Sequence, residues 1–218
     1  MTATALGWIE PDWPAPAHVR VLSTLRGGGV SEGPYASLNL AGHVGDRTDA
    51  VAANRLLLRE AARLPAEPLW LEQVHGTAVE LHASSADTPP RADAAVAFEP
   101  GRVCAVMTAD CLPVVFADRA GTRIGVAHAG WRGLVGGVLQ ATIVALEVPP
   151  VTVSVMVAAA AVFYVGERSR GPAESETQKP PQSDKLSQVA KADAGRAVLL
   201  LVILFPQLAL WLPRQLGY

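Results

Sequence analysis

The order of apolar and polar side chains predicts a strand, a loop and a helix near the start of the chain. Alternation from His18 to Thr24 is typical of a strand, and the glycine-rich segment from Arg26 to Ser31 predicts a loop with free backbone donors. Apolar residues at helical spacing predict a helix from Asp49 to Leu64, which Pro65 ends.

The middle of the chain is dominated by short apolar runs that turns separate. Six of these runs predict strands, at residues 69–74, 77–82, 94–98, 103–107, 113–117 and 123–127. A helix is predicted to follow from Leu134, with an apolar face formed by Val138, Ala141 and Ala145. This mixed order of strands and helices predicts an α+β fold with a mixed sheet.

The sequence changes in character after about Pro149. All three lysines lie in this part, and the polar segment from Glu174 to Ala194 predicts a mobile loop. The apolar segment from Ala197 to Leu212 has 16 residues and contains Pro206, whereas a spanning helix needs about 20. We therefore expect a helix that is buried or covered by a partner.

Composition favours one cytoplasmic domain that acts on a small molecule. Half of the 218 residues are apolar, which is enough for one substantial core, so we expect a single domain over residues 1–218. The net charge of −2 provides no basic field for nucleic acid and no polybasic segment for a membrane surface. The first 16 residues lack the basic start and apolar core of a secretory signal.

Three residues suggest a catalytic metal site. His75, Cys111 and His128 each lie where a predicted strand runs into a turn, at His75-Gly76, Asp110-Cys111 and His128-Ala129-Gly130. Two imidazoles and one thiolate are typical ligands of Zn²⁺, and three protein ligands leave one tetrahedral position open for water or substrate. The chain is therefore predicted to be an enzyme, with Cys104 and Cys111 both free thiols.

Other functions remain open for the same residues. Copper binds well to such ligands, which would suit an oxidase. A metal-free hydrolase would use Cys111 as the nucleophile, with His75 or His128 as its base. A binding protein without catalysis is the remaining class.

Several segments together resemble the bacterial laccase-domain family, also described as polyphenol oxidase-like. The resemblance covers about residues 20–147 and is atypical over 150–218. It rests on Thr24 to Ser31, Ser37 to Leu40, Val44 to Asp46, Asn54-Arg55, Gln73 to Gly76, Thr108 to Pro113 and His128 to Gly133.

The resemblance implies a zinc-dependent purine nucleoside phosphorylase, with His75, Cys111 and His128 as the metal ligands. Its expected substrates are phosphate and adenosine, inosine or methylthioadenosine, and adenosine deaminase activity is a further expectation. The implied fold is a sandwich with flanking helices, shared with cysteine-histidine toxin deamidases. We expect a monomer or a homodimer.

Four further residues are candidates for binding or catalysis. Arg26 and Arg132 lie beside glycines, and their guanidinium groups suit phosphate oxygens. Asp110 is the carboxylate next to Cys111, where it would act as an acid/base, orient a metal ligand or cap the turn. Asn39 would hold either the sugar or a loop.

Overall fold

Two β-sheets enclose the larger apolar cluster of this computed structural model, which describes residues 6–83, 88–157 and 162–167. One sheet has four strands, and each neighbouring pair in it is antiparallel. Its order is β1 (Trp8–Ile9), β2 (Val19–Thr24), β9 (Val162–Glu167) and β5 (Cys104–Met107).

The second sheet has five strands and carries the residues of the candidate site. Its order is β3 (Val79–Leu81), β4 (Ala94–Ala97), β7 (Ile124–Ala129), β6 (Leu112–Asp118) and β8 (Val153–Val157). Only the pair β3 and β4 is parallel among the described strand pairs, so this sheet is mixed, as predicted.

Alternation along the strands divides the apolar side chains between two clusters. In β5, Cys104 and Val106 face the cluster between the sheets, whereas Ala105 faces a second cluster. The first cluster also contains Val115 of β6 and Val126 of β7, so side chains from both sheets share one core. The predicted α+β sandwich is confirmed.

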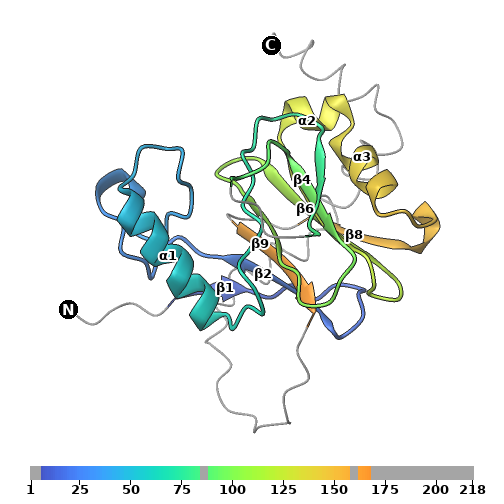
Figure 1. Cartoon of the computed structure of the whole chain (residues 1–218), viewed down its shortest axis with the longest axis horizontal. Helices are drawn as coiled ribbons and strands as arrows, with labels where there is room; N and C mark the ends of the chain where they lie inside the picture. Colours follow the sequence, from blue (N-terminus) through green and yellow to red (C-terminus); the bar gives the residue numbers. More distant parts are fainter. Residues whose placement is uncertain (1–5, 84–87, 158–161, 168–218) are drawn as a thin grey trace, which may run out of the picture. The chain divides into compact units, whose positions relative to one another are not determined.

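The helices cover the two sheets (Figure 1). Helix α1 (Thr48–Ala61) contributes Leu58 to the second cluster, where it meets Leu22 of β2 and Ala105 of β5. Helix α3 (Val138–Ala145) packs against β3, β4 and β7 of the other sheet, and the short helix α2 (Trp131–Gly136) precedes it. Two short 3₁₀ helices, Gly33–Tyr35 and Pro150–Thr152, complete the elements of the described residues.

The single helix predicted from Leu134 is wrong, because the chain forms two helices there. Gly137 adopts φ of +96°, a left-handed conformation that ends α2. The predicted apolar face is also partly wrong. Val138 is buried, but Leu139 and Thr142 complete that face, whereas Ala141 and Ala145 are half-buried.

The strand predicted over residues 69–74 is also wrong. Only Leu69 forms a bridge, with Cys104, and the segment then leaves the sheet. The Gln73 side chain takes the place of a strand partner at the end of β5. Its Nε2 donates to the Met107 carbonyl and its Oε1 accepts from the Met107 N–H, both at 2.7 Å.

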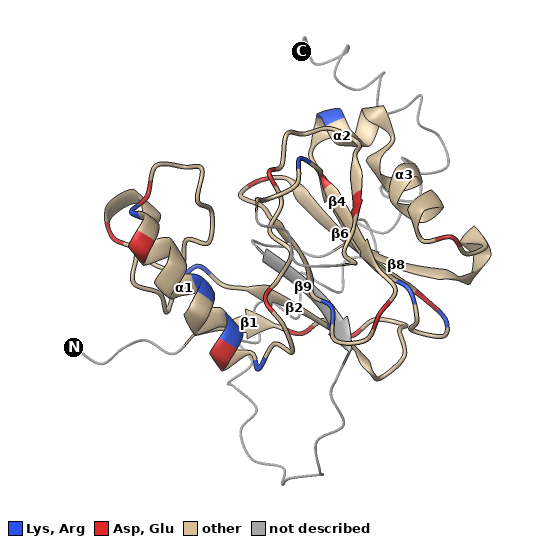
Figure 2. Ribbon diagram, viewed as in Figure 1, with Lys and Arg blue, Asp and Glu red and all other residues tan. Residues whose placement is uncertain are grey.

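The other predicted elements of residues 18–127 occur near their expected positions, and α1 ends at Ala61, before Pro65. The predictions for residues 174–194 and 197–212 lie outside the described residues. Helix α1 carries acidic residues toward both ends, Asp49 and Glu60, with the basic residues Arg55 and Arg59 between them (Figure 2). Within the described residues, no helix has the length and apolar character needed to cross a membrane.

Candidate metal centre

The structure brings together the three predicted metal ligands. The ligand atoms of His75, Cys111 and His128 all lie within 4.8 Å of one another. Cys111 Sγ is 3.7 Å from His75 Nε2, and the two imidazole rings meet edge to face with centroids 4.7 Å apart. Two nitrogen donors and one sulfur donor fit Zn²⁺, and this distance between donors would allow one ion to reach all three.

The β6–β7 hairpin brings Cys111 to the end of the strand that carries His128. Leu112 pairs with Ala129 at the end of this hairpin, so Cys111 and Gly130 lie opposite each other just beyond it. Gly130 leaves room for the ligands, because a Cβ atom at this position would lie 2.8 Å from His75 Cδ2 and 3.0 Å from Cys111 Sγ. A glycine is therefore required by the close approach of side chains, not by its own φ of −66°.

The pairing of β4 with β7 places a carboxylate behind His128. Ala94 pairs with Ala127, which sets Asp93 beside His128, and the His128 N–H donates to the Asp93 carbonyl at 2.7 Å. The side chains also meet, because His128 Nδ1 lies 2.9 Å from Asp93 Oδ1. Both side chains are almost completely buried, with 4% and 0% of their surfaces exposed.

The same carboxylate holds the turn that carries His75. Asp93 Oδ1 accepts the N–H of His75 at 2.8 Å, and Oδ2 accepts the N–H groups of Val74 and Gly76 at 3.2 and 2.7 Å. These bonds accompany a φ of +59° at His75, a conformation that few non-glycine residues adopt. Asp93 thus contacts the segments of two candidate ligands.

Sequence reasoning missed Asp93. The one signal for it is local: a single carboxylate, between Ala92 and Ala94, directly precedes the apolar run 94–98 that is predicted to be a strand. A buried carboxylate in such a place needs several partners. The sequence does not indicate that those partners are His128 and the turn at His75, because they lie 35 and 18 residues away.

The pKa values of Asp93 and of the Cys111 thiol are shifted in opposite directions. Burial acts to raise the pKa of Asp93, but the His128 hydrogen bond and the three backbone N–H groups outweigh it, so the pKa of Asp93 lies below its ordinary value. Burial, followed by the Asp110 carboxylate, raises the pKa of the Cys111 thiol. This shift disfavours the thiolate, which is the nucleophilic form of the side chain.

The second cysteine takes no part in the site. Cys104 is fully buried between the sheets, and this burial raises the pKa of its thiol to about 12. Cys104 and Cys111 are both free, as predicted.

Of the other predicted residues, Asp110 lies at the site and Arg132 is close to it in sequence. Asp110 Oδ1 is 3.7 Å from Cys111 Sγ, which it faces as a hydrogen-bond acceptor. Arg132 is exposed in the first turn of α2, with its guanidinium 5.1 Å from the centre of the Trp131 ring.

Arg26 and Asn39 make their contacts within the loop that precedes α1. Arg26 donates from Nε to the Ala36 carbonyl at 2.6 Å and from Nη2 to the Pro34 carbonyl at 3.0 Å. Asn39 Oδ1 accepts the Ala41 N–H, and Nδ2 donates to Asp46 Oδ2 at 2.9 Å. These bonds correspond to the loop role that was open for Asn39.

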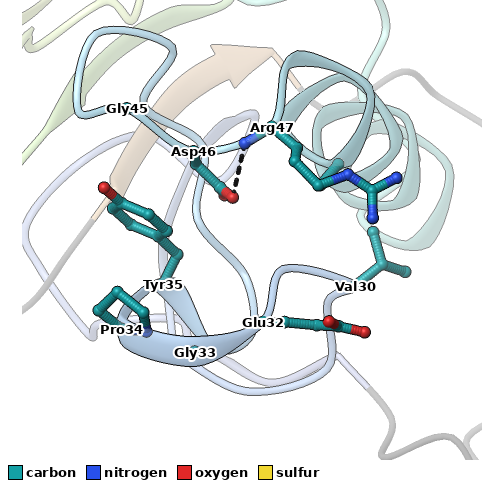
Figure 3. Close-up of a pocket in the computed structure, with 9 residues that line it drawn as sticks. Val30, Glu32, Gly33, Pro34, Tyr35, Gly45, Asp46 and Arg47 are labelled. Atoms are coloured by element: carbon teal, nitrogen blue, oxygen red, sulfur yellow. Dashed lines mark hydrogen bonds between the residues drawn. The ribbon is translucent and has the colours of Figure 1, made fainter.

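A pocket of about 370 Å³ lies in this loop and is separate from the three candidate ligands, none of which lines it (Figure 3). Tyr35, Asp46 and Arg47 are among its lining residues. Tyr35 donates its hydroxyl proton to the Val44 carbonyl, and Asp46 accepts the Arg47 N–H, so both side chains stabilise the loop itself.

Comparison with protein families gives one match over most of the chain. The model of the family described as multi-copper polyphenol oxidoreductase laccase matches residues 20–196. This confirms the resemblance inferred from the motifs.

Several similar proteins are named purine nucleoside phosphorylase, whereas the family description refers to a laccase. A purine nucleoside phosphorylase of Pseudomonas aeruginosa is 55% identical over 143 residues, which are 65% of this chain and 57% of that protein. Purine nucleoside phosphorylase YfiH of Escherichia coli is 54% identical over 135 residues, 62% of this chain and 56% of that protein. The chain thus spans little more than half the length of these relatives.

Solved structures support the fold. A Neisseria meningitidis protein superposes with a TM-score of 0.66 at 52% identity, over 70% of this chain and 62% of that one. YlmD from Geobacillus stearothermophilus has a TM-score of 0.65 at 31% identity, over 72% of this chain and 63% of that one.

Proposed function

The chain belongs to the multi-copper polyphenol oxidoreductase laccase family, and on this premise we propose that it is a zinc-dependent purine nucleoside phosphorylase of the cytoplasm. Its substrates are phosphate and a purine nucleoside such as adenosine, inosine or methylthioadenosine. The relatives named purine nucleoside phosphorylase support this proposal, since they are 46–55% identical to this chain over 135–143 residues.

The observation that carries the proposal is the meeting of His75, Cys111 and His128 within 4.8 Å. A zinc ion bound there would offer an open coordination position and Lewis-acid activation of a bound oxygen. The residues of the chain would hold the ion with two imidazoles and one thiolate, and Asp93 would keep His128 oriented through the bond to Nδ1.

Phosphorolysis exchanges one bond at ribose C1′ for another. A phosphate oxygen forms a bond to ribose C1′ while the bond from C1′ to the purine nitrogen breaks, and the leaving base takes the electron pair and a proton. Arg132 is our candidate for orienting phosphate, because its exposed guanidinium lies two residues after Gly130. The proton comes from the attacking hydrogen phosphate, and Asp110, whose Oδ1 lies 3.7 Å from Cys111 Sγ, is the candidate for passing it to the base.

Arg26 and Asn39 have a supporting role in this proposal. Their bonds to the carbonyls of Pro34, Ala36 and Ala41 order the loop before α1. The Nη1 group of Arg26 makes none of these bonds and remains a candidate for phosphate.

Two alternatives from the sequence receive less support. A metal-free hydrolase requires a thiolate, whereas burial and Asp110 raise the pKa of the Cys111 thiol. A copper oxidase uses the same three ligands, and the family description favours it. A multicopper centre, however, needs many more histidines than the five in this chain.

The test is product analysis with the zinc-loaded protein. Adenosine, inosine and methylthioadenosine are each incubated with and without phosphate, and the products are separated by chromatography. Free base and ribose 1-phosphate formed only with phosphate are the expected products. Inosine formed from adenosine without phosphate would identify a deaminase instead, and phenol oxidation by the copper-loaded protein would identify an oxidase.

Two variants make this test specific to the site. His75→Ala removes one candidate ligand and should abolish phosphorolysis. His43→Ala removes an exposed histidine outside the three and should retain it. Absence of any product from a folded, zinc-bound wild-type protein would reject the proposed activity.

A further inference from the structure

One buried carboxylate contacts two separate parts of the candidate metal site. Asp93 is fully buried directly before β4, where an unpaired carboxylate would be costly. Its two oxygens accept one bond from the His128 side chain and three from the turn at residues 74–76. Each of these partners belongs to a candidate ligand or to a residue next to one.

The bond to His128 selects one form of the imidazole. An ionised carboxylate only accepts hydrogen bonds, so His128 Nδ1 must carry the proton that lies between it and Asp93 Oδ1. A neutral imidazole has a single N–H group, which leaves the lone pair on Nε2. His128 Nε2 is therefore the atom available to a metal ion.

The bonds to the turn place the second imidazole. The backbone at His75 has φ of +59°, which costs a non-glycine residue free energy unless other bonds maintain it. Three consecutive N–H groups, those of Val74, His75 and Gly76, all point to Asp93. This arrangement directs the His75 side chain toward Cys111, 3.7 Å away.

From these contacts we infer that Asp93 is the positioning residue of the metal site, which sets the tautomer of His128 and the backbone conformation of His75 together. This inference rests on the metal site of the proposed function. It adds a residue outside the three candidate ligands, on which the geometry of two of them depends.

The chain contains a matched control for this residue. Asp118 is also buried, at 6% exposure, and its carboxylate also accepts backbone N–H groups, those of Thr122 at 2.8 Å and Arg123 at 3.0 Å. It lies at the opposite end of the β6–β7 hairpin from Cys111 and Gly130. Asp118→Asn therefore disturbs a similar network away from the metal site.

The experiment compares zinc binding by the wild type, Asp93→Asn and Asp118→Asn in competition with a chromophoric chelator. Thermal unfolding of the metal-free proteins checks folding. We expect Asp93→Asn to bind zinc about 10- to 100-fold more weakly, as is typical when a partner of a metal-binding histidine is lost. Asp118→Asn should bind zinc as the wild type does. The cobalt spectrum of Asp93→Asn should also differ from that of the wild type.

Equal zinc affinity of Asp93→Asn and the wild type would overturn the inference. An equal loss in Asp118→Asn would also overturn it, since the effect would then be general destabilisation. If Asp93→Asn does not fold, nitrogen-15 NMR of the wild type decides. A proton on His128 Nδ1 supports the inference, and a proton on Nε2 overturns it.

The same measurements separate this inference from the proposed function. A wild-type protein that binds no zinc would reject the proposed function, while the NMR assignment would still test the pairing of Asp93 with His128. A wild-type protein that binds zinc with an unaffected Asp93→Asn variant would reject the inference alone.

Discussion

Gly130 lies directly against His75, so that a Cβ atom on Gly130 would come within 2.8 Å of His75 Cδ2. The same atom would lie 3.0 Å from Cys111 Sγ. This space exists because the β6–β7 hairpin brings Cys111 and Gly130 opposite each other. The candidate metal site therefore depends on the absence of a side chain as well as on its three donors.

We predict that Gly130→Ala weakens zinc binding about tenfold or more, because the added methyl group displaces two donors from a common ion. Zinc competition titration measures the effect. Gly27→Ala is the control, since a Cβ atom there meets nothing within 4 Å. Unchanged zinc affinity in Gly130→Ala would show that the site does not require this close approach.

Zinc should stabilise the fold by mass action. At a concentration of about 100 times its Kd, a ligand that binds only the folded state adds about 2.7 kcal/mol. The melting temperature of the wild type should thus rise with zinc and fall again with a chelator. His75→Ala should lose this response and His43→Ala should keep it, as differential scanning fluorimetry would show.

Gln73 should contribute to stability through its two bonds to Met107. We expect Gln73→Ala to lower the free energy of unfolding by about 1–3 kcal/mol, because it leaves two backbone groups without these partners. Urea denaturation measures the change. Gln140→Ala, on the exposed side of α3, should change it by no more than about 0.5 kcal/mol.

Asn54 should be more important still, because it is fully buried and ties α1 to the preceding loop. Its Oδ1 accepts the Val30 N–H, and its Nδ2 lies within hydrogen-bonding distance of Ser31 Oγ and the carbonyls of Ser37 and Asn39.

We predict that Asn54→Ala lowers the free energy of unfolding by about 2–4 kcal/mol. Leu56→Ala, at an exposed position of the same helix, is the control for urea denaturation. A loss no larger than that of the control would contradict the importance of this network.

Asp46 should make stability depend on pH on the acid side. Hydrogen bonds from Asn39 and then Ser31 hold the pKa of Asp46 below its ordinary value of 3.8. A folded-state pKa below the unfolded one stabilises the fold above about pH 4, and this contribution disappears as pH falls through the folded-state pKa.

We therefore expect Asp46→Asn to melt at a lower temperature than the wild type near neutral pH, with a difference that shrinks on acidification. Melting curves across this range provide the measurement, with Glu60→Gln, an exposed carboxylate of α1, as the control. A difference that stays constant with pH would argue against a role for the charge of Asp46.

Local patterns in the sequence predicted most elements because they depend on neighbours along the chain. Alternation identified β2, and helical spacing identified α1. The same patterns failed at residues 69–74 and at the helix from Leu134. At the first, Gln73 bonds to Met107, 34 residues away, and at the second, Gly137 adopts a left-handed conformation.

The sequence by itself identified the family and the three candidate ligands, because these follow from residue types in short segments. Only the tertiary structure decided that Asp93 joins His128 to the turn at His75, and that Gly130 makes room for the donors. The reason is physical: both relationships arise from the register between strands, which sets residues side by side without regard to their separation in the chain.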